Sequence, residues 1–480
     1  MKVLIAAAEA VPFAKTGGLA DVTGSLPAAL RAQGVDARLV LPAYRGAGAR
    51  GNGPARRVGQ VSVRVGASDV VGHVLETTSP GNGTPVYLIR NDAYYDRDGL
   101  YGHPDDLERF TFFCRAVLAL GRAVGWSADV IHCHDWHTGL IPVLALLEGR
   151  ARPATAFTIH NLAYQGTFPK DAARVIGVAR GSEGFRLLEM GGFLNFLKGG
   201  IVSADCVNTV SPKYAREIQT PDFGEGLDGV LRLRDEAVTG ILNGIDYTEW
   251  DPATDAALAA NYSRDDISGK LTCKRALQRA NALPEEDVPV LGVVSRLATQ
   301  KGLGLIELVL DELLAADLQF VLLGTGEPHY HELFEEVAKR LPDKTGINLK
   351  YDNTLAHRIY AGSDLFLIPS QYEPCGLTQM IALAYGTIPI VRATGGLADT
   401  VHEHGPSANG FVFFDSSPDS LIAAIDRALA AYKDDLRWRG LMENAFASNF
   451  PWERSAGEYV KLYERALDLA PAAPAMADTT

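Results

Sequence analysis

The chain has 480 residues, which suggests more than one domain because a single hydrophobic core stops growing at about 250–300 residues. Hydrophobic residues make up 47% and charged residues 21% of the sequence. These shares are ordinary for globular proteins and exclude a largely disordered, collagen-like or coiled-coil chain. The net charge of −13 argues against non-specific nucleic-acid binding, which depends on basic surfaces.

The N-terminal segment and the cysteines indicate a reducing compartment. The apolar run at residues 2–8 is shorter than that of a signal peptide and favours a buried first strand. The five cysteines are scattered and form no C-x-x-C pair, which argues against a disulfide framework. No apolar stretch approaches the roughly 18 residues of a membrane helix. We therefore expect a cytoplasmic protein without membrane association.

Strand-like and helix-like segments alternate along the first half of the chain. After the first strand, the pattern predicts a helix at 19–33 and a strand at 37–41 that ends at Pro42. Further buried strands are predicted at 130–134, 154–159 and 206–210. This alternation is typical of a parallel sheet covered by helices.

The same alternation begins again after Gly240. Buried strands are predicted at 288–295, 318–323, 348–351, 365–369 and 388–392. Ser417 and Pro418 are a good N-cap and first residue for a later helix. The sequence therefore predicts an α/β protein with two doubly wound, Rossmann-like domains at 1–240 and 241–450. The Ala/Pro-rich tail at 471–480 is expected to be disordered.

Glycine is more frequent than usual, with 48 residues against an average share of about 7%. Part of the excess lies in a hexapeptide, TGGLAD, found at 16–21 and again at 394–399. Each copy follows a predicted strand, where open α/β sheets bind ligands and where a Gly-rich turn can hold phosphate. The alternative is a pair of tight turns that need glycine. One copy per domain favours two loops that face one cleft.

Three cations stand beside such loops. Lys15 precedes the first Gly-Gly, although neither a Walker A nor a G-x-G-x-x-G motif is present. Arg296 and Lys301 follow a strongly apolar strand, where Arg can grip phosphate with two hydrogen bonds and Lys can act as a point charge. The alternative for all three is a solvated surface position.

The loop after the strand at 365–369 contains Glu373 and leads into a predicted helix. That helix is expected to start around 374–377 and to run to Tyr385. Its free N–H groups and positive dipole end would suit a diphosphate. The alternative is an ordinary Glu-Pro helix start.

Two histidine-containing segments end strands of the first half. His132 and His134 share one face of a strand and could pair on a metal, but no further Cys/His set accompanies them. The alternative reading makes these residues and Asp135 polar groups at the carboxyl edge of the sheet. His160 ends the next strand and either faces the cleft or forms a structural hydrogen bond.

A loop at 91–102 combines tyrosines with polar side chains, among them Tyr95. Such loops suit sugars, because aromatic rings stack on C–H faces while polar groups bind hydroxyls. The alternative is that the tyrosines pack into the core.

Taken together and in order, these motifs resemble those of bacterial glycogen synthases and plant starch synthases. The quoted segments are KTGGL at 15–19, HDWH at 134–137, TIHN at 158–161, NGID at 243–246, SR…QKG at 295–302, EPCGL at 373–377 and TGGL at 394–397. The resemblance covers about residues 1–465. It implies a glycosyltransferase-B fold with two Rossmann-like domains facing a central cleft, and a final helix at 451–470 that crosses back to the N-terminal domain.

The resemblance further implies retaining transfer of glucose from ADP-glucose to the non-reducing end of an α-1,4-glucan, without metal or other cofactor. It assigns catalytic roles to Glu373, His160, Arg296, Lys301 and Asp135. It assigns contacts with ADP-glucose to Lys15, Gly17, Gly18, Asn243, Tyr351, Leu377 and Thr378. Asp21 and Tyr95 are further candidates for donor or acceptor contacts. The sequence does not define an oligomeric state.

One position departs from the wider fold class. Many of its members carry two glutamates separated by seven residues, but the position eight after Glu373 is Ile381. This argues against a paired-carboxylate mechanism and favours front-face attack with the ADP phosphate as base.

Three alternatives stay open, namely a UDP-glucose-using enzyme, an enzyme with a small acceptor such as glucose 1-phosphate, and an inactive glucan-binding protein. No segment suggests the pyridoxal-phosphate lysine of a glucan phosphorylase, and a dehydrogenase is disfavoured by the missing G-x-G-x-x-G.

Overall fold

The computed structural model describes residues 1–149, 152–234 and 236–471, so all but one residue of the predicted tail lies outside the described part. The chain forms two compact units. The N-terminal unit contains Met1–Val210, Ala215–Gly244 and the segment that begins at Trp452, and the C-terminal unit contains Ser211–Tyr214 and Ile245–Pro451. The domain boundaries near residues 240 and 450 stay a prediction.

The N-terminal unit is built on a nine-stranded sheet in the order β12-β11-β7-β6-β1-β2-β5-β4-β3. Its strands are β1 (Lys2–Ala6), β2 (Asp36–Pro42), β3 (Arg56–Val65), β4 (Ser68–Thr78), β5 (Pro85–Arg90), β6 (Val130–His134), β7 (Ala154–Ile159), β11 (Cys206–Thr209) and β12 (Thr239–Gly240). The pairs from β12 to β5 are parallel, and β4 is antiparallel to both β5 and β3. β1 lies between β2 and β6 and is the fifth of the nine strands.

The central parallel strands are buried on both faces. Every residue of β6 and β7 is buried, and both strands have the bounds that the sequence predicts. The antiparallel strands β3 and β4 were not predicted, although β3 alternates valine with polar residues at Val61, Val63 and Val65. This period of two is the usual signal of a strand with one solvated face.

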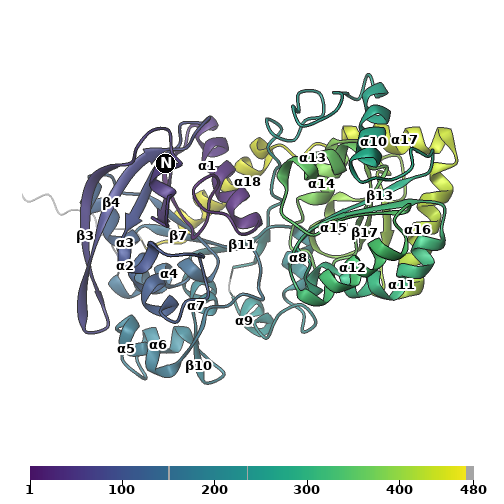
Figure 1. Cartoon of the computed structure of the whole chain (residues 1–480). Helices are drawn as coiled ribbons and strands as arrows, with labels where there is room; N and C mark the ends of the chain where they lie inside the picture. The colour runs from purple at the N-terminus through teal and green to yellow at the C-terminus, as the bar shows by residue number, and fades with distance from the viewer. Residues whose placement is uncertain (150–151, 235, 472–480) are drawn as a thin grey trace, which may run out of the picture. The chain divides into compact units, whose positions relative to one another are not determined.

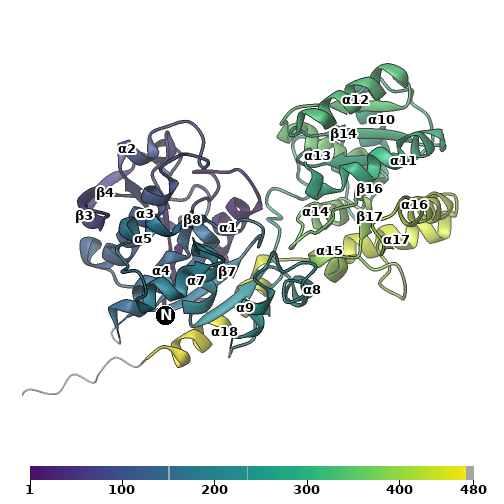
Figure 2. The ribbon, with the colours of Figure 1, turned by 90° about the horizontal axis from the view of Figure 1, so that it is seen from below.

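Helices cover the sheet of the N-terminal unit. They are α1 (Gly18–Ala32), α2 (Asp92–Tyr95), α3 (Asp106–Val124), α4 (Leu140–Glu148), α5 (Ala173–Ile176), α6 (Glu183–Leu188), α7 (Phe196–Ser203), α9 (Asp228–Arg232) and α18 (Trp452–Leu469). A small sheet contains β8 (Thr167–Pro169), β9 (Glu189–Met190) and β10 (Phe193–Asn195). The C-terminal helix α18 packs against α1 and β7 (Figures 1 and 2). Its Trp452, Tyr459 and Tyr463 belong to the core of the N-terminal unit.

The C-terminal unit has an all-parallel sheet in the order β15-β14-β13-β16-β17-β18. Its strands are β13 (Val290–Val294), β14 (Gln319–Leu323), β15 (Thr345–Asn348), β16 (Leu365–Ile368), β17 (Ile388–Arg392) and β18 (Phe411–Phe413). The helices are α10 (Ser268–Ala280), α11 (Leu303–Ala315), α12 (Pro328–Arg340), α13 (Asn353–Gly362), α14 (Thr378–Ala384), α15 (Gly395–Thr400), α16 (Pro418–Tyr432) and α17 (Asp435–Ala447). Helix α8 (Pro212–Glu217) begins in the segment Ser211–Tyr214, which also belongs to this unit. The predicted α/β class with two Rossmann-like parts is confirmed.

Two predicted elements of the C-terminal unit are wrong in position. The strand expected at 348–351 is β15, which pairs with β14 only from Thr345 to Asn348, so Tyr351 lies in the loop beyond it. The helix expected to start around 374–377 is α14, which begins at Thr378 because Gly376 has a left-handed φ of 71° that ends any earlier helical turn.

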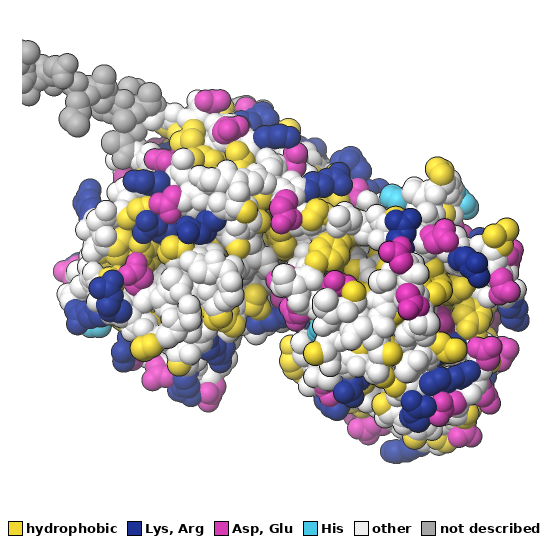
Figure 3. Space-filling view, turned by 90° about the horizontal axis from the view of Figure 1, so that it is seen from above, with side chains coloured by type: hydrophobic (Ala, Val, Ile, Leu, Met, Phe, Trp, Pro, Cys, Tyr) yellow, Lys and Arg dark blue, Asp and Glu magenta, His cyan; other side chains and the backbone are white. Residues whose placement is uncertain are grey.

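The surface carries both signs of charge. On the face shown in Figure 3, Lys and Arg side chains are interspersed with Asp and Glu side chains, between areas of uncharged surface. Among the described residues, no helix is both long and apolar enough to cross a lipid bilayer.

Candidate functional site

Polar residues follow four parallel strands of the N-terminal sheet at their carboxyl ends. Glu9 follows β1, Asp135 follows β6, His160 follows β7 and Asn243 follows β12. The order of the sheet reverses at β1, and ligands of open α/β sheets bind at the carboxyl edge beside such a reversal. This edge is therefore a candidate site.

The buried carboxylate of Glu9 organises the first Gly-Gly loop. Its Oε1 accepts hydrogen bonds from Thr16 Oγ1 at 2.6 Å and from the Tyr101 hydroxyl at 2.7 Å. Its Oε2 accepts from the backbone N–H of Thr16 and, at 3.3 Å, from that of Gly17. Glu9 is not among the site residues predicted from the sequence, although an acidic residue three positions after the first strand is a signal that could have pointed to it.

Gly17 and Lys15 lie at the open side of this loop. Gly17 is the N-cap of α1, has extended backbone dihedrals, and would have no atom within 4 Å of an added Cβ. Lys15 Nζ lies 2.6 Å from Asp21 Oδ1, and both side chains are partly exposed. The predicted residues Lys15, Gly17, Gly18 and Asp21 therefore lie together at the start of α1.

Asp135 and His160 form a second cluster. Asp135 has a φ of 56°, unusual for a residue other than glycine, and its Oδ1 accepts the backbone N–H of His160 at 2.7 Å. Burial raises the pKa of Asp135 to about 7, although backbone N–H donors from His160 and Asn161 oppose this shift. Burial lowers the pKa of His160 to about 3, so this ring is neutral at physiological pH.

The remaining histidines of this edge are buried and neutral. Burial lowers the pKa values of His132 and His137 to about 3 and places that of His134 well below its usual range. His137 stacks on the Tyr101 ring with centroids 4.4 Å apart. Within the described residues, no group of three or more His, Cys, Asp and Glu side chains is arranged to hold a metal ion.

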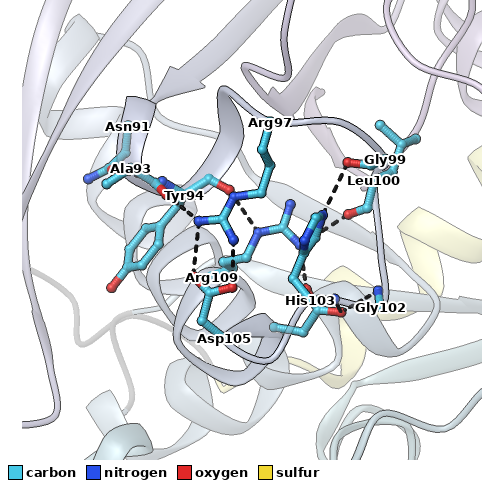
Figure 4. Close-up of polar contacts among 11 residues, drawn as sticks. Asn91, Ala93, Tyr94, Arg97, Gly99, Leu100, Gly102, His103, Asp105 and Arg109 are labelled. Carbon is cyan, nitrogen blue, oxygen red and sulfur yellow. Dashed lines mark hydrogen bonds and ion pairs between the residues drawn. The ribbon is translucent and has the colours of Figure 1, made fainter.

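The loop at 91–102 is held by Arg109 and Arg97 (Figure 4). The fully buried Arg109 donates from Nε to the Tyr94 carbonyl at 2.8 Å and from Nη1 to the Leu100 carbonyl at 3.1 Å. Arg97 Nη1 pairs with Asp105 Oδ1 at 2.7 Å (Figure 4). These contacts fix the loop that presents Tyr101 to Glu9.

Tyr95 and Asn243 differ in how their polar atoms are used. Tyr95 is fully buried, and its hydroxyl donates to the Arg109 carbonyl at 2.9 Å, which favours packing over contact with a sugar. Asn243 is also buried, but its Oδ1 makes no hydrogen bond with any residue that the structure describes. A buried amide oxygen in this state is suited to a donor from a ligand.

In the C-terminal unit, Glu373 and Lys301 are brought together. Lys301 Nζ lies 2.7 Å from Glu373 Oε2, and the Ser370 hydroxyl donates to the same oxygen at 2.9 Å. The side chains of Lys301 and Glu373 are only 20% and 9% exposed, so the pair is largely withdrawn from solvent. Ser370 lies in the loop that follows β16 and was not predicted as a site residue.

Glycines let three loops of this unit approach each other. A Cβ on Gly302 would lie 1.9 Å from the Pro369 carbonyl oxygen, and one on Gly395 would lie 1.9 Å from that of Glu373. Both glycines also have left-handed φ values, of 73° and 44°. The loops that carry Lys301, Glu373 and the second Gly-Gly are therefore in direct backbone contact at the carboxyl ends of β13, β16 and β17.

Four other predicted residues of this unit lie near these loops or beyond them. Arg296 is exposed directly after β13. Leu377 and Thr378 are half-buried at the start of α14. Tyr351 is 77% exposed in the loop after β15, and no contact of its ring in the described residues assigns it a role.

Comparisons with known proteins identify the family. The family model described as starch synthase catalytic domain matches residues 2–233, and that described as glycosyl transferases group 1 matches residues 274–440. The chain is 47% identical to a glycogen synthase from Moorella thermoacetica, covering 98% of this chain and 97% of the relative. It is 46% identical to one from Geotalea daltonii, over 97% and 99% of the two chains.

Solved structures agree with these relatives. The structure resembles the catalytic domain of starch synthase IV from Arabidopsis thaliana bound to ADP and acarbose, with a TM-score of 0.87, 36% identity, and coverage of 97% of this chain and 99% of the other. A sucrose-phosphate synthase from Thermosynechococcus elongatus shares the fold at a TM-score of 0.62 and 20% identity, over 97% and 99% of the two chains. The chain is thus a glycosyltransferase, and it belongs to the glycogen synthase family that its motifs resemble.

Proposed function

We propose that the protein transfers glucose from ADP-glucose, with retention of configuration, to the non-reducing 4-hydroxyl of an α-1,4-glucan and releases ADP. The observation that carries this proposal is the close match, over nearly the whole chain, to a starch synthase catalytic domain bound to ADP and acarbose. The relatives named glycogen synthase support glycogen as the glucan.

Lys301 and Arg296 would neutralise the charge that develops on the leaving phosphate. The Lys301 ammonium is already held in place by Glu373, whose carboxylate also accepts from Ser370, in a site with little solvent where a fixed charge is worth more than in water. The N–H groups of Leu377 and Thr378 would add hydrogen bonds to the same phosphate.

Glu373 would bind hydroxyls of the transferred glucose, since Lys301 and Ser370 leave its Oε1 for a further donor in the described contacts. Lys15, the Gly17-Gly18 turn, Asn243 and His160 would contact the donor from the N-terminal unit. The unpartnered Oδ1 of Asn243 supports this role. Tyr351 would stack on the base, and Asp21 would act through Lys15.

The chemical step is proposed to proceed by front-face attack, with the ADP phosphate as the base. The position where a second carboxylate would stand is Ile381, which is buried on α14. Mass spectrometry of protein quenched during turnover tests this step, because a glucosylated side chain would refute it.

The test of the function measures nucleoside diphosphate released from ADP-glucose or UDP-glucose in the presence of glycogen. We expect release from ADP-glucose that depends on glycogen. Faster turnover of UDP-glucose would reassign the donor, release with glucose 1-phosphate but not glycogen would reassign the acceptor, and no turnover with either donor would leave a glucan-binding protein.

The five cysteines are all free and buried, which supports the proposed cytoplasmic location.

A further inference from the structure

A chain of buried hydrogen bonds in the N-terminal unit fixes the protonation of His132. The Thr158 hydroxyl donates to Asn208 Oδ1 at 2.6 Å, and His132 Nε2 lies 2.6 Å from the same hydroxyl. Because a hydroxyl has a single proton, Thr158 accepts from His132, which therefore carries its proton on Nε2. The other nitrogen, Nδ1, accepts from the Tyr463 hydroxyl of α18 at 2.8 Å. Both ring nitrogens of His132 are thus occupied.

The neighbouring ring of His134 has one partnered and one unpartnered nitrogen. Its centroid lies 4.0 Å from that of His132, and its Nδ1 lies 2.8 Å from His160 Nε2. Its Nε2 is buried and has no hydrogen-bond partner in the described part of the chain. A buried N–H without an acceptor is rarer than a lone pair without a donor, so the proton belongs on Nδ1. His134 then donates to His160 Nε2.

The tautomer of His160 follows from this bond. Both rings are neutral, because burial lowers the pKa of His134 and that of His160. If His160 Nε2 accepts, its single ring proton is on Nδ1. The backbone N–H of His160 is held by Asp135 Oδ1 at 2.7 Å and the ring is held by His134, so both the backbone and the ring have a fixed partner. His160 Nδ1 makes no hydrogen bond within the described residues and is left for a ligand.

We propose that His134 is a positioning residue that locks His160 in its Nδ1–H tautomer, so that His160 meets the substrate as a hydrogen-bond donor and not as a proton acceptor. The proposal rests on the proposed function for the position of His160 at the donor sugar. Without His134, the His160 ring would be free to move its proton to Nε2 and to present a lone pair to the substrate instead.

Two substitutions separate this role from packing. In His134→Asn, the side-chain amide can place an N–H where the imidazole Nδ1–H was, whereas His134→Phe keeps the ring volume and removes the donor. We expect the Asn variant to keep most of kcat, and the Phe variant to lose about 10- to 100-fold in kcat, as do other losses of an orienting partner. The KM for glycogen should stay close to that of the wild type in both. A role in packing alone predicts the opposite ranking, because Phe fills the buried site better. A Phe variant with wild-type kcat would therefore overturn the proposal.

The tautomer can also be read without any substrate. In the full-length protein labelled with ¹⁵N-histidine, ¹⁵N chemical shifts distinguish a protonated ring nitrogen from an unprotonated one. We expect protons on Nδ1 of His160 and His134 and on Nε2 of His132, with each signal assigned by its loss in a single variant. A proton on His160 Nε2 in the wild-type protein contradicts the proposal. The expected tautomers in a protein that releases no ADP from ADP-glucose would instead refute the proposed function and leave the locked tautomer standing.

Discussion

The hexapeptide TGGLAD occurs at 16–21 and again at 394–399, and the two copies differ in what surrounds their first glycine. Gly17 has extended dihedrals and no atom within 4 Å of an added Cβ. Gly395 has a φ of 44°, and an added Cβ would lie 1.9 Å from the Glu373 carbonyl oxygen. The first glycine therefore lies in open space, whereas the second allows close packing against the Glu373 carbonyl.

The last residues of the two copies also differ. Asp21 pairs with the Lys15 side chain at 2.6 Å, whereas Asp399 accepts the backbone N–H of Lys213 at 2.7 Å. The first copy opens α1, a helix of 15 residues, and the second opens α15, with only 6. Identical sequence thus serves two purposes, because the surrounding elements decide whether the first glycine lies in open space or packs against another loop.

The largest expected effect is that of replacing Glu373, which packs against the second TGGLAD loop. In Glu373→Gln, the shape is kept but the charge that holds Lys301 is lost. We expect kcat to fall about 100- to 1000-fold, the usual loss when a preorganised polar group of a transition state is removed. Steady-state kinetics with ADP-glucose and glycogen measures it. The control is Glu327→Gln on the neighbouring loop, where an exposed carboxylate accepts from Thr299 and should be replaceable with little change in kcat. Equal effects of the two substitutions would remove Glu373 from its role.

The two glycines can be compared directly by the same substitution. Gly395→Ala forces a Cβ into the Glu373 carbonyl at a left-handed φ, and we expect a loss of about 2–4 kcal/mol in the free energy of unfolding. Gly17→Ala should cost at most about 1 kcal/mol, the difference between Gly and Ala at an N-cap. Thermal and chemical unfolding of both variants test this. If the two losses are equal, the contrast between the loops is wrong.

Hydrogen bonds to the Glu9 carboxylate stabilise the first TGGLAD loop, whereas backbone packing stabilises the second. In Glu9→Gln, an amide NH₂ replaces one of the oxygens that accept from Thr16, Gly17 and Tyr101. We expect a loss of about 1–3 kcal/mol in stability, the cost of leaving a buried donor unpaired. The KM for ADP-glucose should also rise, because the loop loses its fixed shape. Tyr101→Phe removes only one of these donors and should have a smaller effect on both quantities.

The smallest expected effect is a pH dependence of stability that arises from Asp135 in the N-terminal unit. The folded-state pKa of Asp135 is raised to about 7, so the folded protein holds this proton more tightly than the unfolded chain does. Its contribution to stability is therefore present at low pH and falls as the pH rises from about 4 to about 7. The melting temperature of Asp135→Asn minus that of the wild type should increase over this range, since the histidine contributions cancel in the difference. A constant difference would contradict the raised pKa.

Fully buried strands were the most predictable part of the fold. The prediction of β6 and β7 is correct at both ends, because strands buried on both faces carry no Asp, Glu, Lys or Arg, and these two contain only apolar residues, threonine and histidine. β15 was misplaced by a few residues, since apolar and polar residues alternate on both sides of its true end. The hairpin of β3 and β4 was missed, although its alternating valines carry the signal.

The candidate site was predictable as residue types at strand ends, and not as contacts. The placement of Lys301 against Glu373 depends on Gly302 passing the Pro369 carbonyl, a long-range contact that local sequence does not contain. Glu9 escaped notice because its importance lies in four donors, three from the adjacent loop at Thr16 and Gly17 and one from the distant Tyr101. The roles of these residues in catalysis stay a prediction.

The position of α18 has a consequence for synthesis on the ribosome. Ala456, Tyr459, Leu462 and Ala466 of this helix complete the core that begins with Val3 and Ile5 of β1. The C-terminal unit is nearly continuous in the chain, from Ile245 to Pro451, and has all its residues before α18 emerges. The half of the protein that is translated first is therefore the last to finish folding, and a chain that stops before Trp452 leaves its first-made core uncovered.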